Sequence, residues 1–351
     1  MNTSSALRGG LLALLAAALF GLSTPLVQRF GQGLGAFSTA ALLYAGAAFV
    51  ALWMRQPVEL EAKLRRTDLP RLLAMAGFGA VIGPVALAWG LQRTSGTSAS
   101  LMLTLEALFT VVLAWRLYGE SMDKRVAAAM LLLLAGGIAL VADQGLAGNA
   151  QLLGLLAVLL ATAAWGLDNT LSRGVAERDP AQVVLFKSAL GATASTVLAF
   201  LFGEPLPHLY AALALLAVGA VGYGLSLRFY LLAQRAFGAA RTGSVFAFAP
   251  FIGAMGAFAF GDRSIVWIML VAGVLMLASV ALHLMESHGH PHTHEVLEHE
   301  HSHSHDPKQA DGHHLHTHDT MPLGPHSHPH RHEPTRHTHP HVPDVHHGHG
   351  H

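Results

Sequence analysis

The chain has 351 residues, of which 52% are hydrophobic and only 12% are charged, and its 21 basic residues balance its 21 acidic residues. Soluble domains carry about 25% charged residues, so this composition excludes a soluble domain with a charged surface and indicates lipid as the natural solvent. The balanced charge excludes the basic surface of a nucleic-acid-binding protein. The lack of cysteine excludes disulfides and thiolate metal ligands.

Ten apolar stretches follow one another along the chain, each about long enough to cross the roughly 30 Å hydrocarbon layer as a helix. They lie at residues 9–28, 36–54, 70–91, 97–117, 125–142, 152–172, 182–202, 209–232, 240–260 and 265–285. The first follows Arg8 like a secretory signal, but nine further stretches indicate that it is retained. Because lipid forces backbone pairing within each segment, the predicted fold class is an all-α membrane protein.

Basic residues in the loops predict the orientation of the chain. With the N-terminus inside, most of them fall on the cytoplasmic side, as the positive-inside rule requires. The cytoplasmic set is Arg8, Arg55, Lys63, Arg65, Arg66, Arg71, Arg116, Lys124, Arg125, Arg173, Arg178, Arg235 and Arg241. The opposite side receives Arg29, Arg93 and Arg263. Ten spans then place the C-terminus in the cytoplasm as well.

The sequence contains a weak internal repeat of about 143 residues. The segment "ALFGLSTPLVQRFG" at 18–31 matches "TAAWGLDNTLSRGV" at 162–175, and residues 94–121 match residues 237–264. The predicted domains are therefore two five-helix repeats, 1–143 and 144–286, followed by a tail, 287–351. Because five is an odd number, the second repeat is inverted relative to the first. Secondary transporters often have this architecture, with the substrate site between the halves.

The ten-span pattern resembles a known family. With "LEALFTVVLAWRLYGE" ending the fourth stretch and "FAPFIGAMGAFAFGD" ending the ninth, residues 8–285 resemble EamA-type permeases of the drug/metabolite transporter superfamily. The resemblance implies an inverted-repeat bundle that moves small organic solutes, often outward, without a bound cofactor. Members usually carry proline in the fourth helix, where this chain has Ala107, and often have arginine near the position of Tyr44. These departures leave the substrate class open.

Four ionisable side chains lie within the apolar stretches: Glu106, Asp168, Lys187 and Arg228. A charge at mid-membrane costs about 2.5–3.5 kcal/mol even on the lenient insertion scale, so such residues face the bundle interior or water. Lys187 and Arg228 lie near cytoplasmic ends, which favours snorkelling to the headgroups or ion pairing over substrate contact. For Asp168 with Asn169, interhelical hydrogen bonding and a place on the transport path are equally supported.

Glu106 is the strongest candidate for a functional charge, because it lies near the centre of its span without a basic residue one turn away. A carboxyl group in a low-dielectric site can bind and release a proton, as a proton-coupled antiporter needs. The alternative is a buried pair with Lys187 or Arg228 that fixes helix register. Pro250 is predicted to kink or break the ninth helix, and Trp165 either lines the cavity or fills the core.

The composition changes abruptly at residue 287, and all but two of the 25 histidines lie beyond residue 286. This segment cannot bury a core and is predicted to be a disordered, His-rich tail. Neutral imidazole is a good ligand for Zn, Ni, Co and Cu, so the tail is predicted to bind divalent transition metal. The candidate ligands are His288, His290, His292, His294, His299, His301, His303, His305, His313, His314, His316 and His318.

Together these features predict a multi-pass carrier in a bacterial inner membrane, with both termini cytoplasmic. It is expected to move small organic metabolites or drug-like solutes by alternating access, with no required cofactor and a tail that binds metal ions. Two alternatives stay open: a divalent transition-metal transporter, and a membrane-anchored metal buffer. The sequence shows no nucleophile–base pair, so an enzyme is not expected. The expected partners are the lipid bilayer, a small-molecule substrate and metal ions, not nucleic acid, and a homodimer is one allowed state.

Overall fold

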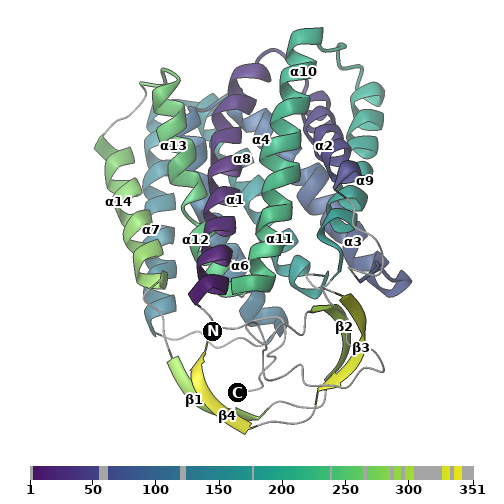
Figure 1. Cartoon of the computed structure of the whole chain (residues 1–351). Helices are drawn as coiled ribbons and strands as arrows, with labels where there is room; N and C mark the ends of the chain where they lie inside the picture. Colours follow the sequence, from purple (N-terminus) through teal and green to yellow (C-terminus); the bar gives the residue numbers. More distant parts are fainter. Residues whose placement is uncertain are drawn as a thin grey trace.

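The protein is a bundle of long helices with a small layer of strands below one end (Figure 1). The computed structural model describes residues 3–54, 62–118, 124–175, 178–237, 239–263, 267–284, 288–293, 297–303, 326–332 and 336–341. The N-terminus lies at the end of the bundle that faces the strands. The all-α prediction therefore holds for the bundle.

The helices follow the apolar stretches in chain order. The first half contains α1 (Thr3–Phe30), α2 (Ala36–Trp53), η1 (Arg66–Asp68), α3 (Leu69–Met75), η2 (Ala76–Ile82), α4 (Gly83–Leu91), α5 (Gly96–Met102), η3 (Leu103–Leu105), α6 (Glu106–Tyr118) and α7 (Lys124–Ala147). The second half contains α8 (Asn149–Ser172), η4 (Arg173–Val175), α9 (Pro180–Leu201), α10 (Leu209–Val218), η5 (Gly219–Leu225), α11 (Ser226–Phe237), α12 (Ala239–Phe246), α13 (Ala249–Ala259) and α14 (Trp267–Leu284).

Eight helical segments among the described residues are long and apolar enough to cross a membrane. They match the first eight predicted spans, as Ala36–Trp53 does for the stretch 36–54. In the last two predicted spans the apolar helices are shorter, Ala249–Ala259 and Trp267–Leu282. A multi-pass membrane protein is therefore confirmed, and the full number of ten crossings stays a prediction.

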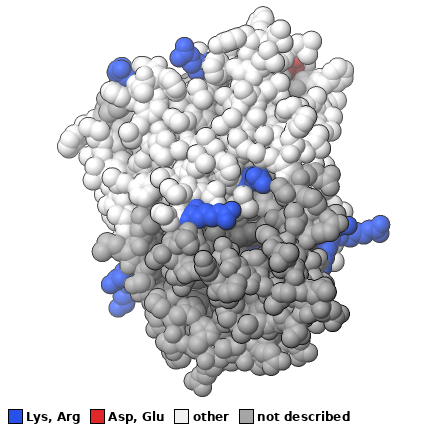
Figure 2. Space-filling view, in the orientation of Figure 1, with Lys and Arg blue, Asp and Glu red and all other residues white. Residues whose placement is uncertain are grey.

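The outer surface of the bundle has the character expected for contact with lipid. Large apolar side chains point outward along it, among them Leu131, Phe200 and Val274, which are 67%, 86% and 66% exposed. In Figure 2, the basic side chains on this face lie near the top and near the border with the grey atoms, and the surface between them is uncharged. Because no water-facing charge interrupts this belt, it suits a hydrocarbon layer.

Two spans contain a π-helical segment, and two others change geometry along their length. The π-helices η2 (Ala76–Ile82) and η5 (Gly219–Leu225) are both glycine-rich and start 143 positions apart. The fourth span changes to 3₁₀ geometry at η3 (Leu103–Leu105), and the ninth has a turn at residues 247–248, again 143 positions beyond 104–105. Such irregularities in helices are frequent at functional sites.

Helices of the two halves pack against one another in a symmetric way. The helix α2 packs on α9, and α7 packs on α14. The helix α1 packs on α11 and α13, just as α8 packs on α4 and α6. Glycine permits the closest approach, since a Cβ atom on Gly46 or Gly219 would overlap the backbone of the facing helix. The central core between the halves includes Leu43, Tyr44 and Trp165.

The described segments of the histidine-rich tail are paired strands, so the predicted disorder is not confirmed there. The strand β1 (His288–Thr293) pairs antiparallel with β4 (Arg336–His341), and β2 (Leu297–His303) pairs with β3 (His326–His332). Histidines recur at every second position in these segments, which is the period of a strand. Each sheet has two strands among the described residues, a size that is marginally stable in water by itself.

Candidate functional site

A cluster of polar side chains lies in the middle of the bundle, between helices of the two halves. The ammonium group of Lys187 on α9 pairs with Oδ2 of Asp168 on α8. Both residues are only 3% exposed. Beside them, the amide of Asn169 donates a hydrogen bond to Oε1 of Glu106 on α6. Three helices therefore bring two carboxylates, one ammonium and one amide together.

Local geometry explains why neighbouring residues of α8 bind different partners. Asp168 and Asn169 are consecutive, and consecutive side chains on an α-helix point about 100° apart. Asp168 can thus face α9 while Asn169 faces α6. The change to 3₁₀ geometry at η3 immediately precedes Glu106, the first residue of α6.

The π-helix η2 presents a backbone carbonyl to the same region. The oxygen of Gly79 accepts a hydrogen bond from the Tyr44 hydroxyl and another, 2.9 Å long, from Nε1 of Trp165. A Cβ atom on Gly79 would overlap the carboxyl group of Asp168. Glycine is therefore required at this position, because any side chain would displace the Asp168–Lys187 pair.

Aromatic rings from both halves cover the polar cluster. The Phe20 ring lies edge-on to Trp165 at 5.5 Å and to Tyr223 at 5.8 Å between ring centroids. Tyr44 lies edge-on to Tyr223 at 5.5 Å. Phe246 contacts Phe20 at 5.5 Å and extends the group. The contacts of Phe20 with Trp165 and Tyr223 and of Tyr44 with Tyr223 are edge-to-face, a geometry that aromatic pairs prefer. Together the rings form one continuous wall.

The cluster has one ammonium group for two carboxylates. Glu106 interacts electrostatically with both Asp168 and Lys187, and Oδ1 of Asp168 is buried without a hydrogen-bond partner among the described residues. A buried acceptor without a donor is costly, and an excess carboxylate attracts a proton or a cation. The site can thus take up a proton, a cationic group or a hydrogen-bond donor.

The structure brings five of the residues singled out from the sequence into one site: Glu106, Asp168, Asn169, Lys187 and Trp165. Of the two alternatives for Lys187, ion pairing is confirmed and snorkelling is wrong, because its partner Asp168 lies inside the bundle. The ammonium group of Lys187 pairs directly with Asp168 and also acts electrostatically on Glu106.

Two other predicted path residues take no part in these contacts. Arg228 lies on α11, and its Nε atom is buried without a hydrogen-bond partner among the described residues. Pro250 occupies the first turn of α13, directly after the turn at residues 247–248. The predicted break of the ninth helix is therefore confirmed, because α12 ends before this proline and α13 begins beside it.

Sequence reasoning missed several residues of the site: Phe20, Tyr44, Gly79, Tyr223 and Phe246. The repeat places Tyr44 opposite Lys187, and Gly79 forms a GxxxG pair with Gly83 that predicts close helix packing, but neither pattern assigns these residues to the site. The signal for Tyr44 was its position, since it lies 143 residues before Lys187. The role of Gly79 depends on a backbone carbonyl, which the sequence does not reveal.

The candidate metal ligands fall partly within the described tail. His288, His290 and His292 lie on β1, and His299, His301 and His303 lie on β2. The other six are outside the described residues: His294, His305, His313, His314, His316 and His318. Within the described part of the chain, no three histidine, aspartate or glutamate side chains lie close enough to hold a metal ion.

Comparisons with known proteins agree with the architecture of the bundle. A curated protein from Methanothermobacter thermautotrophicus (strain Delta H), described as an uncharacterized transporter, is 27% identical over 233 residues, which are 63% of this chain. The chain spans 66% of that relative's length. A solved crystal structure is similar to this chain with a TM-score of 0.56 at 21% sequence identity. The match covers 80% of this chain and 96% of the chain in that structure, and at this identity it supports the fold alone. The model of the EamA-like transporter family matches twice, over residues 7–142 and 152–285. The chain therefore belongs to the EamA-like transporter family.

Proposed function

We propose that this membrane transporter exports small organic metabolites or drug-like solutes by alternating access, and that the central cluster contacts the solute. The observation that carries the proposal is the pair of carboxylates, Glu106 and Asp168, buried beside a single ammonium group under a wall of aromatic rings. Charges are retained within a membrane only where they are paired or used. The rings suit a flat apolar part of a solute, and Oδ1 of Asp168 suits its donor group.

The alternating movement would occur between two inverted halves, residues 1–143 and 144–286. Support for this division comes from the two family matches and from the two π-helices, which begin 143 positions apart. The turn in the ninth span also follows the 3₁₀ segment in the fourth by the same interval. Broken helices commonly line the substrate path of secondary transporters.

Glu106 is the proposed coupling residue, and its replacement by glutamine tests the proposal. Purified protein in vesicles that contain a pH-sensitive dye would be exposed to a panel of small amines, amino acids and nucleosides. Wild-type protein should move protons against a solute gradient, and Glu106→Gln should lose this exchange while it still inserts and stays monodisperse. Glu204→Gln, which changes a glutamate outside the cluster, is the matched control. Unchanged exchange in Glu106→Gln would overturn the coupling role.

The tail is the proposed binding site for divalent transition metal. The strand register sets histidine opposite histidine at 288 and 341, at 290 and 339, and at 292 and 337. Calorimetry with Ni²⁺ or Zn²⁺ should show binding to the full chain at pH 7, and deletion of residues 287–351 should abolish it. Acid should release the metal, because the unperturbed pKa of histidine is about 6.5. Equal binding after the deletion would overturn this proposal, and uptake of radiolabelled nickel into vesicles would make the metal a cargo.

Both termini are proposed to lie in the cytoplasm of a bacterial cell. The support is the excess of basic residues in the loops at the end of the bundle that carries the N-terminus. Single cysteines at the exposed residue 32 and at residue 351, in a chain that has none of its own, give a direct test with an impermeant thiol reagent. Only the cysteine at residue 32 should be labelled from outside, and labelling of both would refute the orientation.

A further inference from the structure

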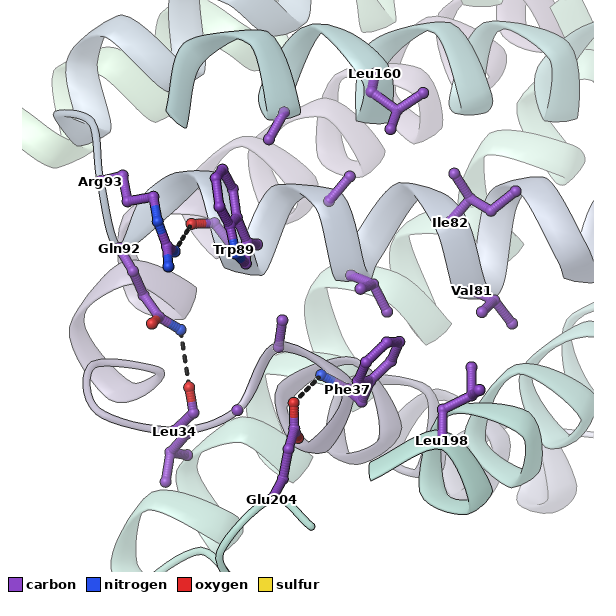
Figure 3. A pocket seen from close by; sticks show the side chains of 15 residues that line it. Leu34, Phe37, Val81, Ile82, Trp89, Gln92, Arg93, Leu160, Leu198 and Glu204 are labelled. Atoms are coloured by element: carbon purple, nitrogen blue, oxygen red, sulfur yellow. Dashed lines mark hydrogen bonds between the residues drawn. The ribbon is translucent and has the colours of Figure 1, made fainter. Parts of the chain in front are cut away.

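A groove of about 720 Å³ opens on the side of the bundle, away from the polar cluster. Its walls come from α2, α4, α8 and α9, so both halves contribute to it (Figure 3). The wall residues within the span are almost entirely apolar. They include Val81, Ile82, Val85, Ala157, Leu160 and Leu198. Ile82 and Leu160 are 38% and 55% exposed, so the groove opens toward the surrounding lipid.

One stripe of the third span runs along the whole groove. Val81 at the end of η2, Val85 and Trp89 on α4, and Arg93 just beyond α4 line it at intervals of four residues, so that neighbours in this series lie on the same side of the span. At 1.5 Å per residue, this stripe is about 18 Å long. One leaflet of the roughly 30 Å hydrocarbon layer is about 15 Å thick. The groove therefore has the length of a single acyl chain within one leaflet.

The polar residues of the groove gather at the end farthest from the N-terminus. Glu204 is already used there, because its two carboxylate oxygens accept hydrogen bonds from the Phe37 and Ser38 amides at 3.1 and 2.7 Å. The Gln92 amide donates to the Leu34 carbonyl at 2.9 Å. Both polar neighbours of Arg93 thus have partners within the protein.

Arg93 is held at this end with hydrogen-bonding capacity to spare. Its guanidinium lies 3.7 Å from the centroid of the Trp89 ring, and one nitrogen donates to the Trp89 carbonyl at 2.8 Å. A guanidinium has five N–H donors in a planar fork that matches a phosphate group. Tryptophan is enriched where lipid headgroups meet the hydrocarbon layer. This end therefore has the charge and the depth of a headgroup site.

We propose that the groove binds one phospholipid, with one acyl chain along the stripe of Val81, Val85 and Trp89 and the phosphate on Arg93. The leaflet is the outer one if the proposed orientation is right, and that assignment rests on the proposed function. The binding itself does not depend on transport. Because the walls come from both halves, the bound lipid stabilises their arrangement in this conformation.

The number of lipid molecules bound per chain can be measured with the intact full-length protein. The chain would be extracted in a mild detergent, supplied with palmitoyl-oleoyl phosphatidylglycerol, and analysed by mass spectrometry of the intact complex. We expect one tightly held lipid per chain. Arg93→Gln should weaken it about tenfold, which corresponds to about 1.4 kcal/mol, and Arg93→Lys should restore part of the affinity. Ala157→Leu, which fills the groove without changing charge, should also reduce occupancy.

Arg263→Gln is the matched control for Arg93→Gln. Arg263 follows α13 and also stacks on an aromatic ring of that helix, Phe258 at 4.2 Å, and donates to that residue's carbonyl, but it does not line the groove. Its replacement should leave lipid occupancy unchanged. Equal occupancy in all variants, or equal loss with Arg263→Gln, would overturn the proposal. So would cross-linking that placed a second copy of the chain over Trp89. If the wild-type protein bound lipid as expected but exchanged no solute, that result would count against the proposed function alone.

Discussion

Replacement of Lys187 by methionine tests whether the central ion pair holds the bundle together. Methionine fills a similar volume but removes the ammonium group that binds Asp168. Asp168 would then keep a charge in a position that is 3% exposed. Because water cannot screen that charge, we expect Lys187→Met to destabilise the protein strongly.

The expected cost follows from the burial of the pair. The side chains of Lys187 and Asp168 are 3% and 5% exposed, and loss of one partner of such a buried pair costs about 3–5 kcal/mol. Protonation of Asp168 would not lower this cost much, since neutralising a carboxyl group with an ordinary pKa of about 3.9 costs about 4 kcal/mol at pH 7. The double variant Lys187→Met with Asp168→Asn removes both charges, so it should recover about 2–3 kcal/mol of this loss.

Denaturant unfolding of the purified protein in mixed micelles, followed by circular dichroism, measures these differences. Thr196→Val is the control, because it changes an exposed residue of the same helix, α9, and should stay within about 0.5 kcal/mol of the wild type. The reasoning fails if Lys187→Met is as stable as this control. It also fails if the two single effects simply add in the double variant, since independent sites show no coupling.

The remaining predictions concern the glycine beside the ion pair and the contacts at the far end of the bundle. Gly79→Ala should lower the free energy of unfolding by about 1–3 kcal/mol, because the new methyl group would overlap the Asp168 carboxyl. A methyl group at Gly77 would meet nothing within 4 Å, so Gly77→Ala should be nearly neutral in the same unfolding assay. Glu204→Gln should cost about 1 kcal/mol, because it weakens the acceptor of two backbone amides at the start of α2. Asp262→Ala should cost a similar amount, since its carboxylate accepts two 2.9 Å hydrogen bonds at the start of α5.

Each of these outcomes has a clear contrary result. Equal stability of Gly79→Ala and Gly77→Ala would show that the π-helix is not packed against the ion pair. A loss below about 0.3 kcal/mol for both Glu204→Gln and Asp262→Ala would show that the two carboxylates do not cap helices of the first half. His208→Gln, in the same end of the bundle, is the control for these two changes, because its only described role is to precede α10.

The spans were predictable because lipid imposes a simple requirement on every residue that it touches. A run of apolar residues was enough to locate α2 within one residue and the segment 209–234 within two. The same requirement exposed Glu106, Asp168 and Lys187 as unusual, since a charge within a span must be paired or used. The break at Pro250 was readable too, because proline lacks a backbone donor.

The partners of these charges were not predictable, because they depend on how each helix is rotated about its axis. The sequence allowed Lys187 to bind Glu106, Asp168 or the headgroups, and only the packing of α8 on α9 and α6 selects Asp168. The Gly79 carbonyl was hidden for another reason. Its exposure to Tyr44 and Trp165 depends on the π-helix, and a glycine-rich sequence alone does not distinguish a π-helix from an α-helix.

The two π-helices connect the site to the movement that the proposed mechanism requires. At η2, Gly79 lies against Asp168 and its carbonyl binds side chains from α2 and α8. At η5, Gly219 and Gly222 approach the backbone of α2 and the side chain of Ser23. The backbone of each segment therefore packs directly against the core. The hydrogen bonding of both segments departs from the α-helical pattern, and bends in helices concentrate at such places. A solute that displaced Asp168 would act directly on η2, so we expect the third and eighth spans to bend first when the site opens.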